Sequence, residues 1–165
     1  MTETTSPALR TALAYFEAWT SHDLDKAMEY VAADVIVDAP AGRLEGRAAY
    51  LAFMRPFVQI LKGSEIIAAF GDEKTAVIVY DTATVPVASA PAAECVTVSD
   101  GTITYNRFIF DRAPFDAARQ AAAGASLGDE RGGYPPRYFP RRAGNIRPAG
   151  FVARHVSFHK LQIFT

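Results

Sequence analysis

The sequence predicts a single α+β domain, in which three N-terminal helices cover one face of a curved antiparallel sheet, followed by a C-terminal extension. Two observations predict this fold class. Apolar residues recur every three or four positions up to residue 61 and every second position from residue 64 to 110. Further along, glycine, proline and arginine become frequent and neither period continues. We therefore divide the 165 residues into a domain at 1–124 and an extension at 125–165.

Three helices are expected in the first part of the chain. The first should begin at Ser6-Pro7, an N-cap and first-turn pair, and continue to about residue 21. Asp23 is a suitable N-cap for the second helix. A short strand at 35–37 should then precede a third helix at 47–61, whose apolar residues lie on one face.

Four long strands are expected after these helices. Their sequences are rich in β-branched and aromatic residues with a period of two. Gly71-Asp72 and Asp100-Gly101 are turn signals between neighbouring strands, and Asp100-Gly101 is the stronger hairpin signal. The expected strands are 64–70, 75–85, 92–98 and 102–110.

Composition excludes several classes of protein. No apolar run approaches the roughly 20 residues that a membrane span needs. The N-terminus has no basic segment followed by an apolar one, so we expect a cytoplasmic protein. A single cysteine, Cys95, excludes an intrachain disulfide and a thiolate metal cluster. His155 and His159 have helical metal-ligand spacing but lack a third ligand, so no metal site is predicted.

Three segments of the domain resemble a known superfamily. They are AYFEAWTSHDLDKAMEYVAADVIVDAP, GRLEGRAAYLAFM and DGTITYNRFIFDRAPF. Together they resemble the nuclear transport factor 2-like superfamily, especially its SnoaL-like members, which are related to polyketide cyclases and ketosteroid isomerases. The resemblance implies a cone-shaped fold around an apolar pocket, but it does not determine the reaction, since this superfamily includes several kinds of enzyme and many proteins without catalytic activity.

The resemblance to ketosteroid isomerase implies two candidate catalytic residues and bears on a third, Asp38. The helical tyrosine of that family falls on Tyr15, and its neutral carboxylic acid falls on Glu94. Its catalytic base stands immediately before a proline, where this chain has Ala39, so Asp38 lies one position too early. One step along a strand reverses the face of a side chain. We therefore expect Asp38 to be a turn residue, although a bulge would rotate it inward.

Strand parity extends the list of candidate site residues. If Glu94 faces the pocket, the same register directs Tyr80 inward as a further catalytic candidate, able to polarise a carbonyl group. Glu94 has two interpretations, as a buried acid of raised pKa or as an outward-facing surface acid. Tyrosines at such positions are more often core residues whose hydroxyls reach the surface, and this is the alternative interpretation of both Tyr15 and Tyr80. The candidate substrate-binding residues are Trp19, Met54, Ile78, Asn106, Phe108 and Phe110.

Two functions of different classes remain. One is a cofactor-independent isomerase, cyclase or lyase that acts on a small hydrophobic carbonyl compound and uses Glu94 with Tyr15 or Tyr80. The other is a non-catalytic ligand-binding or dimeric interaction module on the same fold. No glycine-rich phosphate loop is present, so no nucleotide cofactor is expected. Residues of opposite parity, such as Val77, Val79 and Ile109, should form an apolar outer face, and family members commonly form homodimers through it.

The extension differs from the domain in charge. Residues 1–118 contain 9 basic and 16 acidic residues, whereas 119–165 contain 8 basic and 2 acidic residues. The basic, aromatic extension could bind single-stranded nucleic acid, but the acidic domain would repel the same polyanion. We therefore do not expect nucleic acid as a partner. Residues 151–164 are too apolar to remain solvated, and we expect them to cover the domain or its dimer partner.

Overall fold

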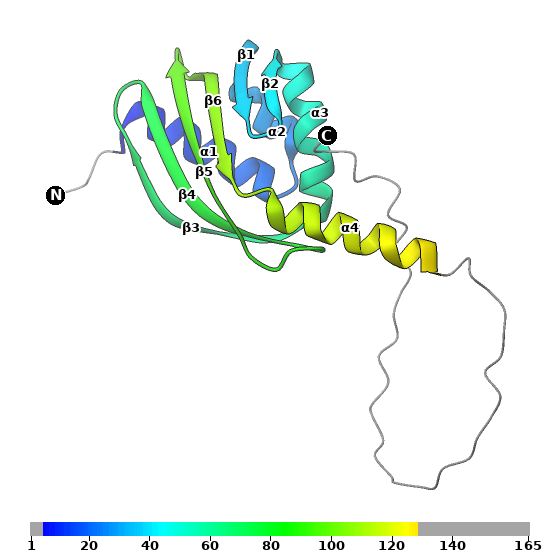
Figure 1. Cartoon of the computed structure of the whole chain (residues 1–165). Coiled ribbons are helices and arrows are strands. Elements are labelled where there is room, and N and C mark those ends of the chain that lie inside the picture. The colour runs from blue at the N-terminus through cyan, green and yellow to red at the C-terminus, as the bar shows by residue number, and fades with distance from the viewer. Residues whose placement is uncertain (1–4, 129–165) are drawn as a thin grey trace, which may run out of the picture.

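A curved sheet of six strands forms the scaffold, as the computed structural model of residues 5–128 shows (Figure 1). Its strand order is β2-β1-β6-β5-β4-β3, and the sheet does not close on itself. The helices are α1 (Pro7–Thr20), α2 (Leu24–Glu29), α3 (Arg47–Ile60) and α4 (Ala113–Gly128). The strands are β1 (Val31–Ala39), β2 (Gly42–Glu45), β3 (Leu61–Gly71), β4 (Thr75–Thr84), β5 (Ala90–Ser99) and β6 (Thr102–Phe110).

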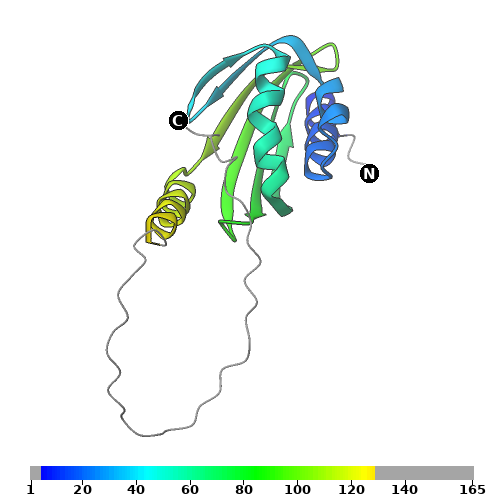
Figure 2. The same ribbon diagram turned by 90° about the vertical axis from the view of Figure 1, so that its right-hand side faces the viewer.

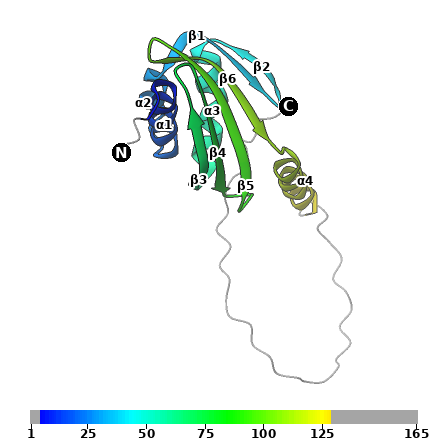
Figure 3. The ribbon, with the colours of Figure 1, turned by 90° about the vertical axis from the view of Figure 1, so that its left-hand side faces the viewer.

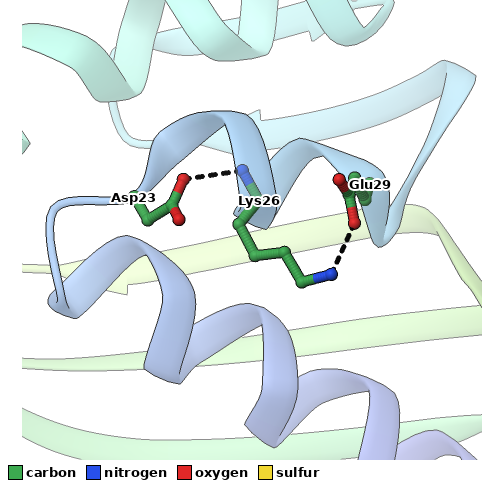
Figure 4. A network of polar contacts seen from close by, with 3 residues as sticks. All are labelled: Asp23, Lys26 and Glu29. Atoms are coloured by element: carbon green, nitrogen blue, oxygen red, sulfur yellow. Dashed lines mark hydrogen bonds and ion pairs between the residues drawn. The ribbon is translucent and has the colours of Figure 1, made fainter.

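The first three helices lie against one face of this sheet, as expected from the sequence (Figure 2). Pro7 occupies the first turn of α1, where its missing N–H has no helical partner to lose. The Asp23 carboxylate caps α2 by accepting a hydrogen bond of 2.9 Å from the amide of Lys26. Lys26 in turn pairs with Glu29 on the helix surface (Figure 4).

Two tight turns set the register of the long strands. Asp100 and Gly101 both have positive φ, 49° and 75°, which is typical of a type I′ hairpin turn between β5 and β6. At the β3–β4 turn, the Asp72 carboxylate accepts hydrogen bonds of 2.8 Å from the amides of Lys74 and Thr75. Both turn predictions are therefore confirmed.

Three features of the fold correct the sequence prediction. The sheet is mixed, because β1 pairs with β6 in parallel while the other strand pairs are antiparallel. β1 also begins earlier than the strand expected at 35–37, and it continues through a turn into β2, which was not predicted. Finally, a helix that was not predicted, α4, follows β6 and continues to Gly128.

Strand register separates the side chains into two faces. Ile78, Glu94 and Phe108 stand next to one another on β4, β5 and β6, and all three are buried beneath the helices. On the opposite face, Phe70 is 69% exposed and Ile109 is 56% exposed. The sheet therefore has one covered and one open face.

The structure describes no helix in residues 5–128 that is long and apolar enough to cross a membrane. Within the same range, no group of three or more His, Cys, Asp or Glu residues could hold a metal ion. The predictions for the C-terminal segment at 151–164 and for His155 and His159 fall outside the described residues.

Candidate functional site

Glu94 lies in the middle of β5 on the covered face of the sheet and is only 2% exposed. Two side chains from the neighbouring strands bind its carboxylate. The Tyr80 hydroxyl on β4 donates to Oε1 over 2.8 Å, and Asn106 Nδ2 on β6 donates to Oε2 over 2.7 Å. Because all three positions have the same parity on adjacent strands, the sheet itself brings them together.

The buried environment of Glu94 brings the pKa of its carboxyl group close to neutral pH. Burial raises the pKa of Glu94 to about 7, and the hydrogen bonds from Asn106 and Tyr80 partly oppose this effect. Both protonation states are therefore populated at neutral pH. A general acid or base is most effective when its pKa lies near the working pH, so this carboxyl group is suited to proton transfer.

Two further tyrosines extend the hydrogen bonding into the core. Asn106 Nδ2 also donates to the Tyr50 hydroxyl over 2.7 Å, and the hydroxyls of Tyr50 and Tyr15 are 2.5 Å apart. Burial raises the pKa of Tyr15, Tyr50 and Tyr80 well above the usual value, so all three hydroxyls keep their protons at neutral pH. These residues form what we call the polar network, which comprises Tyr15, Tyr50, Tyr80, Glu94 and Asn106.

The orientation of the Asn106 amide suits an ionised Glu94, because both donor contacts come from Nδ2. Asn106 Oδ1 is buried and has no hydrogen-bond partner among the described residues. A half-turn of the amide would present this oxygen to Glu94, which becomes a donor when it is protonated. Because this half-turn would move Nδ2 to the buried position where Oδ1 has no partner, the observed orientation favours the ionised carboxylate.

An apolar cavity of about 40 Å³ lies next to the polar network. Tyr80 is the one network member that lines it, and its ring packs against Phe16 and Trp19 at centroid distances of 4.9 and 5.8 Å. Thr82 also lines the cavity, but its hydroxyl donates to the Ala90 carbonyl over 3.1 Å. The remaining lining residues are apolar: Phe53, Met54, Phe57, Ala90, Ala92, Phe108, Phe110 and Phe115.

The predicted site residues do not all meet at this cavity. Glu94 and Asn106 lie behind Tyr80 rather than on the cavity wall, and Tyr15 is at the far end of the polar network. Trp19 and Ile78 are buried in the core and do not line the cavity. The predicted residues on its wall are Tyr80, Met54, Phe108 and Phe110.

Asp38 is the candidate catalytic residue that the structure separates from the site. It pairs in register with Arg107 on β6, whereas its neighbour Val37 pairs with Asn106. Asp38 therefore lies on the open face, and no bulge rotates it inward at this end of β1. Its carboxylate accepts a hydrogen bond of 2.8 Å from the Tyr105 hydroxyl and lies 4.0 Å from the Arg43 guanidinium.

Sequence reasoning missed two contributors to the site. Tyr50 lies in the helix expected at 47–61 and was not among the candidate site residues, yet its hydroxyl connects Asn106 with Tyr15. A tyrosine among otherwise aliphatic and phenylalanine positions was the available signal, since a buried hydroxyl needs a partner. Phe115 belongs to α4, which was not predicted, although Pro114 and the alanines that follow are typical of a helix start and interior.

Comparisons with known proteins agree with this architecture. A structure from Kribbella flavida DSM 17836 is 56% identical, with a TM-score of 0.71, and the match covers 72% of this chain and 98% of that one. An NTF2-like protein of unknown function from Cytophaga hutchinsonii is 18% identical, with a TM-score of 0.58, over 70% of this chain and 99% of that one.

A steroid delta-isomerase from Pseudomonas aeruginosa is 11% identical, with a TM-score of 0.59, over 78% of this chain and 96% of that one. At identities this low, the last two similarities show the fold alone. No curated protein matches the chain. The family model of the SnoaL-like domain matches residues 12–106, from within α1 to within β6. The chain therefore belongs to the SnoaL-like family.

Proposed function

We propose that this protein is a cofactor-independent acid–base catalyst, an isomerase, cyclase or lyase, that acts on a small apolar carbonyl compound. The observation that carries the proposal is the 2.8 Å hydrogen bond from Tyr80, on the cavity wall, to Glu94, whose pKa is raised to about 7. Tyr80 thus connects a group that titrates near neutrality with an apolar binding space.

The proposed step is a proton relay. As the C–H bond next to the substrate carbonyl breaks, its proton passes to the Tyr80 oxygen while the Tyr80 proton passes to Glu94 Oε1. The electron pair of the broken bond forms the enolate, and the relay runs in reverse to return the proton at a new position or to the oxygen of a leaving group. Asn106 supports the relay by donating to Glu94 Oε2 while the carboxylate is charged.

Replacing Tyr80 with phenylalanine is expected to slow proton transfer by about a hundredfold or more, because the ring remains but the relay loses its hydroxyl. We suggest measuring hydrogen–deuterium exchange next to the carbonyl of cyclohexanone and phenylacetone in D₂O by NMR. Tyr15→Phe is the matched control, since it removes an equally buried hydroxyl that does not line the cavity. Equal rates for wild type and Tyr80→Phe would contradict the relay.

The apolar character of the cavity wall supports a second candidate function, which is non-catalytic binding of a small hydrophobic molecule. Apart from Tyr80 and Thr82, the lining residues carry no polar side-chain group. A protein of this kind would bind apolar ketones without accelerating exchange, and Tyr80→Phe and Glu94→Gln would leave that binding unchanged. The exchange assay therefore separates the two functions.

A homodimer formed through the open face of the sheet is a further part of the proposal. Phe70 and Ile109 are largely exposed there, and the same face includes the half-buried residues Val77 and Val79. An apolar surface of this kind is favourable when a second copy covers it. Ile109→Glu is expected to convert the dimer to a monomer in sedimentation equilibrium at micromolar concentration.

The control for the dimer is Val85→Glu, which adds the same charge at an exposed valine outside the strands of the sheet. This variant should remain dimeric. A wild-type monomer at micromolar concentration would contradict the proposed dimer without affecting the proposed chemistry.

A further inference from the structure

α4 contributes one fully buried side chain among its described residues 113–125. It follows β6 after two residues, and the Asp111 carboxylate caps its start by accepting a hydrogen bond of 2.9 Å from the amide of Ala113. The helix then projects beyond the sheet (Figures 1 and 3). Among its residues up to Ala125, whose side chains the structure describes, Phe115 is the one that is buried.

The Phe115 side chain is 3% exposed and forms part of the cavity wall. It packs with Val87 and Ala90 at the connection between β4 and β5. Its ring also meets that of Phe57 on α3, with centroids 6.4 Å apart in an edge-to-face arrangement. Phe115 thus lies between α3 and the start of β5, and both of these elements contribute residues to the cavity wall.

Because the cavity is small, the position of Phe115 on its wall affects whether a ligand can enter. A volume of about 40 Å³ accommodates no more than a few water molecules, whereas pockets for small organic ligands have volumes of roughly 300 Å³ or more. A ligand with a ring must therefore displace part of the wall. The other aromatic lining residues belong to α3, β4 and β6, which are held by the sheet or packed across its covered face, whereas Phe115 lies in the first turn of α4.

We propose that Phe115 is a plug, which narrows the pocket in the empty protein and moves out with α4 when a ligand enters. Phe115 thereby sets the size of the molecule that the pocket admits. The inference rests on the proposed function only in taking this cavity as the substrate site, and it makes no assumption about the chemistry at Glu94.

The first test is binding of a neutral apolar fluorophore, N-phenyl-1-naphthylamine, to the full-length protein. In wild type, part of the binding free energy is spent on removing the phenylalanine from its apolar contacts, whereas Phe115→Ala has no plug to displace. The variant is expected to bind the fluorophore roughly tenfold to a hundredfold more tightly. Phe70→Ala is the matched control, because it makes the same substitution on the open face and should bind like wild type.

The second test uses wild type alone, so it does not depend on a variant that folds. Saturation with the fluorophore should accelerate amide hydrogen exchange in α4, measured by mass spectrometry over residues 113–125, without accelerating exchange in β5. Tighter binding by Phe115→Ala together with this acceleration would support the plug. Equal affinities for wild type and Phe115→Ala, unchanged exchange in α4, or no binding to either protein would overturn it.

These results are independent of the proposed catalysis. Glu94→Gln should bind the fluorophore as wild type does, since Glu94 does not line the cavity. If the relay is wrong but the plug is right, no variant accelerates ketone exchange, yet Phe115→Ala still binds more tightly.

Discussion

Replacing Glu94 with glutamine is expected to reduce the rate of ketone proton exchange by about a hundredfold to ten-thousandfold. Glutamine has nearly the same shape and can still accept a hydrogen bond from Tyr80 or Asn106, but it cannot take up a proton from the Tyr80 hydroxyl. The effect should therefore be on the rate, and binding of the fluorophore should be preserved.

The pH dependence of the wild-type rate provides a second signature of Glu94. The relay starts with a charged carboxylate, so the rate should fall as the pH decreases through about 7, the pKa to which burial raises Glu94. The residual activity of Glu94→Gln should not follow this profile. Rates measured by NMR between pH 5 and pH 9 would test both expectations.

Asp38→Asn is the control for this experiment, because it neutralises an aspartate on the open face that is bonded to Tyr105. It should change the exchange rate much less than Glu94→Gln does. A larger loss of exchange rate in Asp38→Asn than in Glu94→Gln would show that the network around Glu94 is structural. This result would overturn the proposed mechanism.

The free energy of unfolding is expected to decrease by about 3 kcal/mol between pH 4 and pH 9 through Glu94 alone. The pKa of this group is about 7 in the folded protein, against an ordinary value of 4.5. The folded state therefore binds the proton more tightly than the unfolded state does. This contribution to stability is fully present below pH 4.5 and is lost as the pH rises through 7.

Urea unfolding of wild type and Glu94→Gln across this pH range isolates the contribution of Glu94, because the other titrating groups are common to both proteins. The difference in unfolding free energy, wild type minus variant, should decrease as the pH rises and become constant above about pH 8. Parallel profiles for the two proteins would mean that the carboxyl group titrates as it does in water.

The sequence could predict the long strands and three of the helices because local rules determine them. Asp100-Gly101 adopts the positive φ values that a tight hairpin requires, and the period-two pattern continues on both sides of it. The parallel pairing of β1 with β6 is different, since it depends on a contact between segments far apart in the chain. No local pattern encodes that choice. α4 was missed because one buried phenylalanine does not create an amphipathic period.

The candidate site could be predicted only where strand parity determines it. Tyr80, Glu94 and Asn106 share a face because their positions on adjacent strands have the same parity. Parity does not reveal which of them reaches the cavity, since this depends on the depth at which the helices pack. For the same reason Tyr50, on α3, could be assigned to the core from its sequence but not to the polar network.

The parallel pairing of β1 with β6 has a consequence for the order of folding. β3 to β6 are joined by short connections and can form as a meander of local contacts. β1 must instead find β6 across most of the domain, as the hydrogen bond between Asp38 and Tyr105 illustrates, since these residues are 67 positions apart. Closing so long a loop costs entropy that only later contacts repay. We therefore expect β1 to dock late, so that Tyr105→Phe accelerates unfolding more than it slows refolding in stopped-flow kinetics.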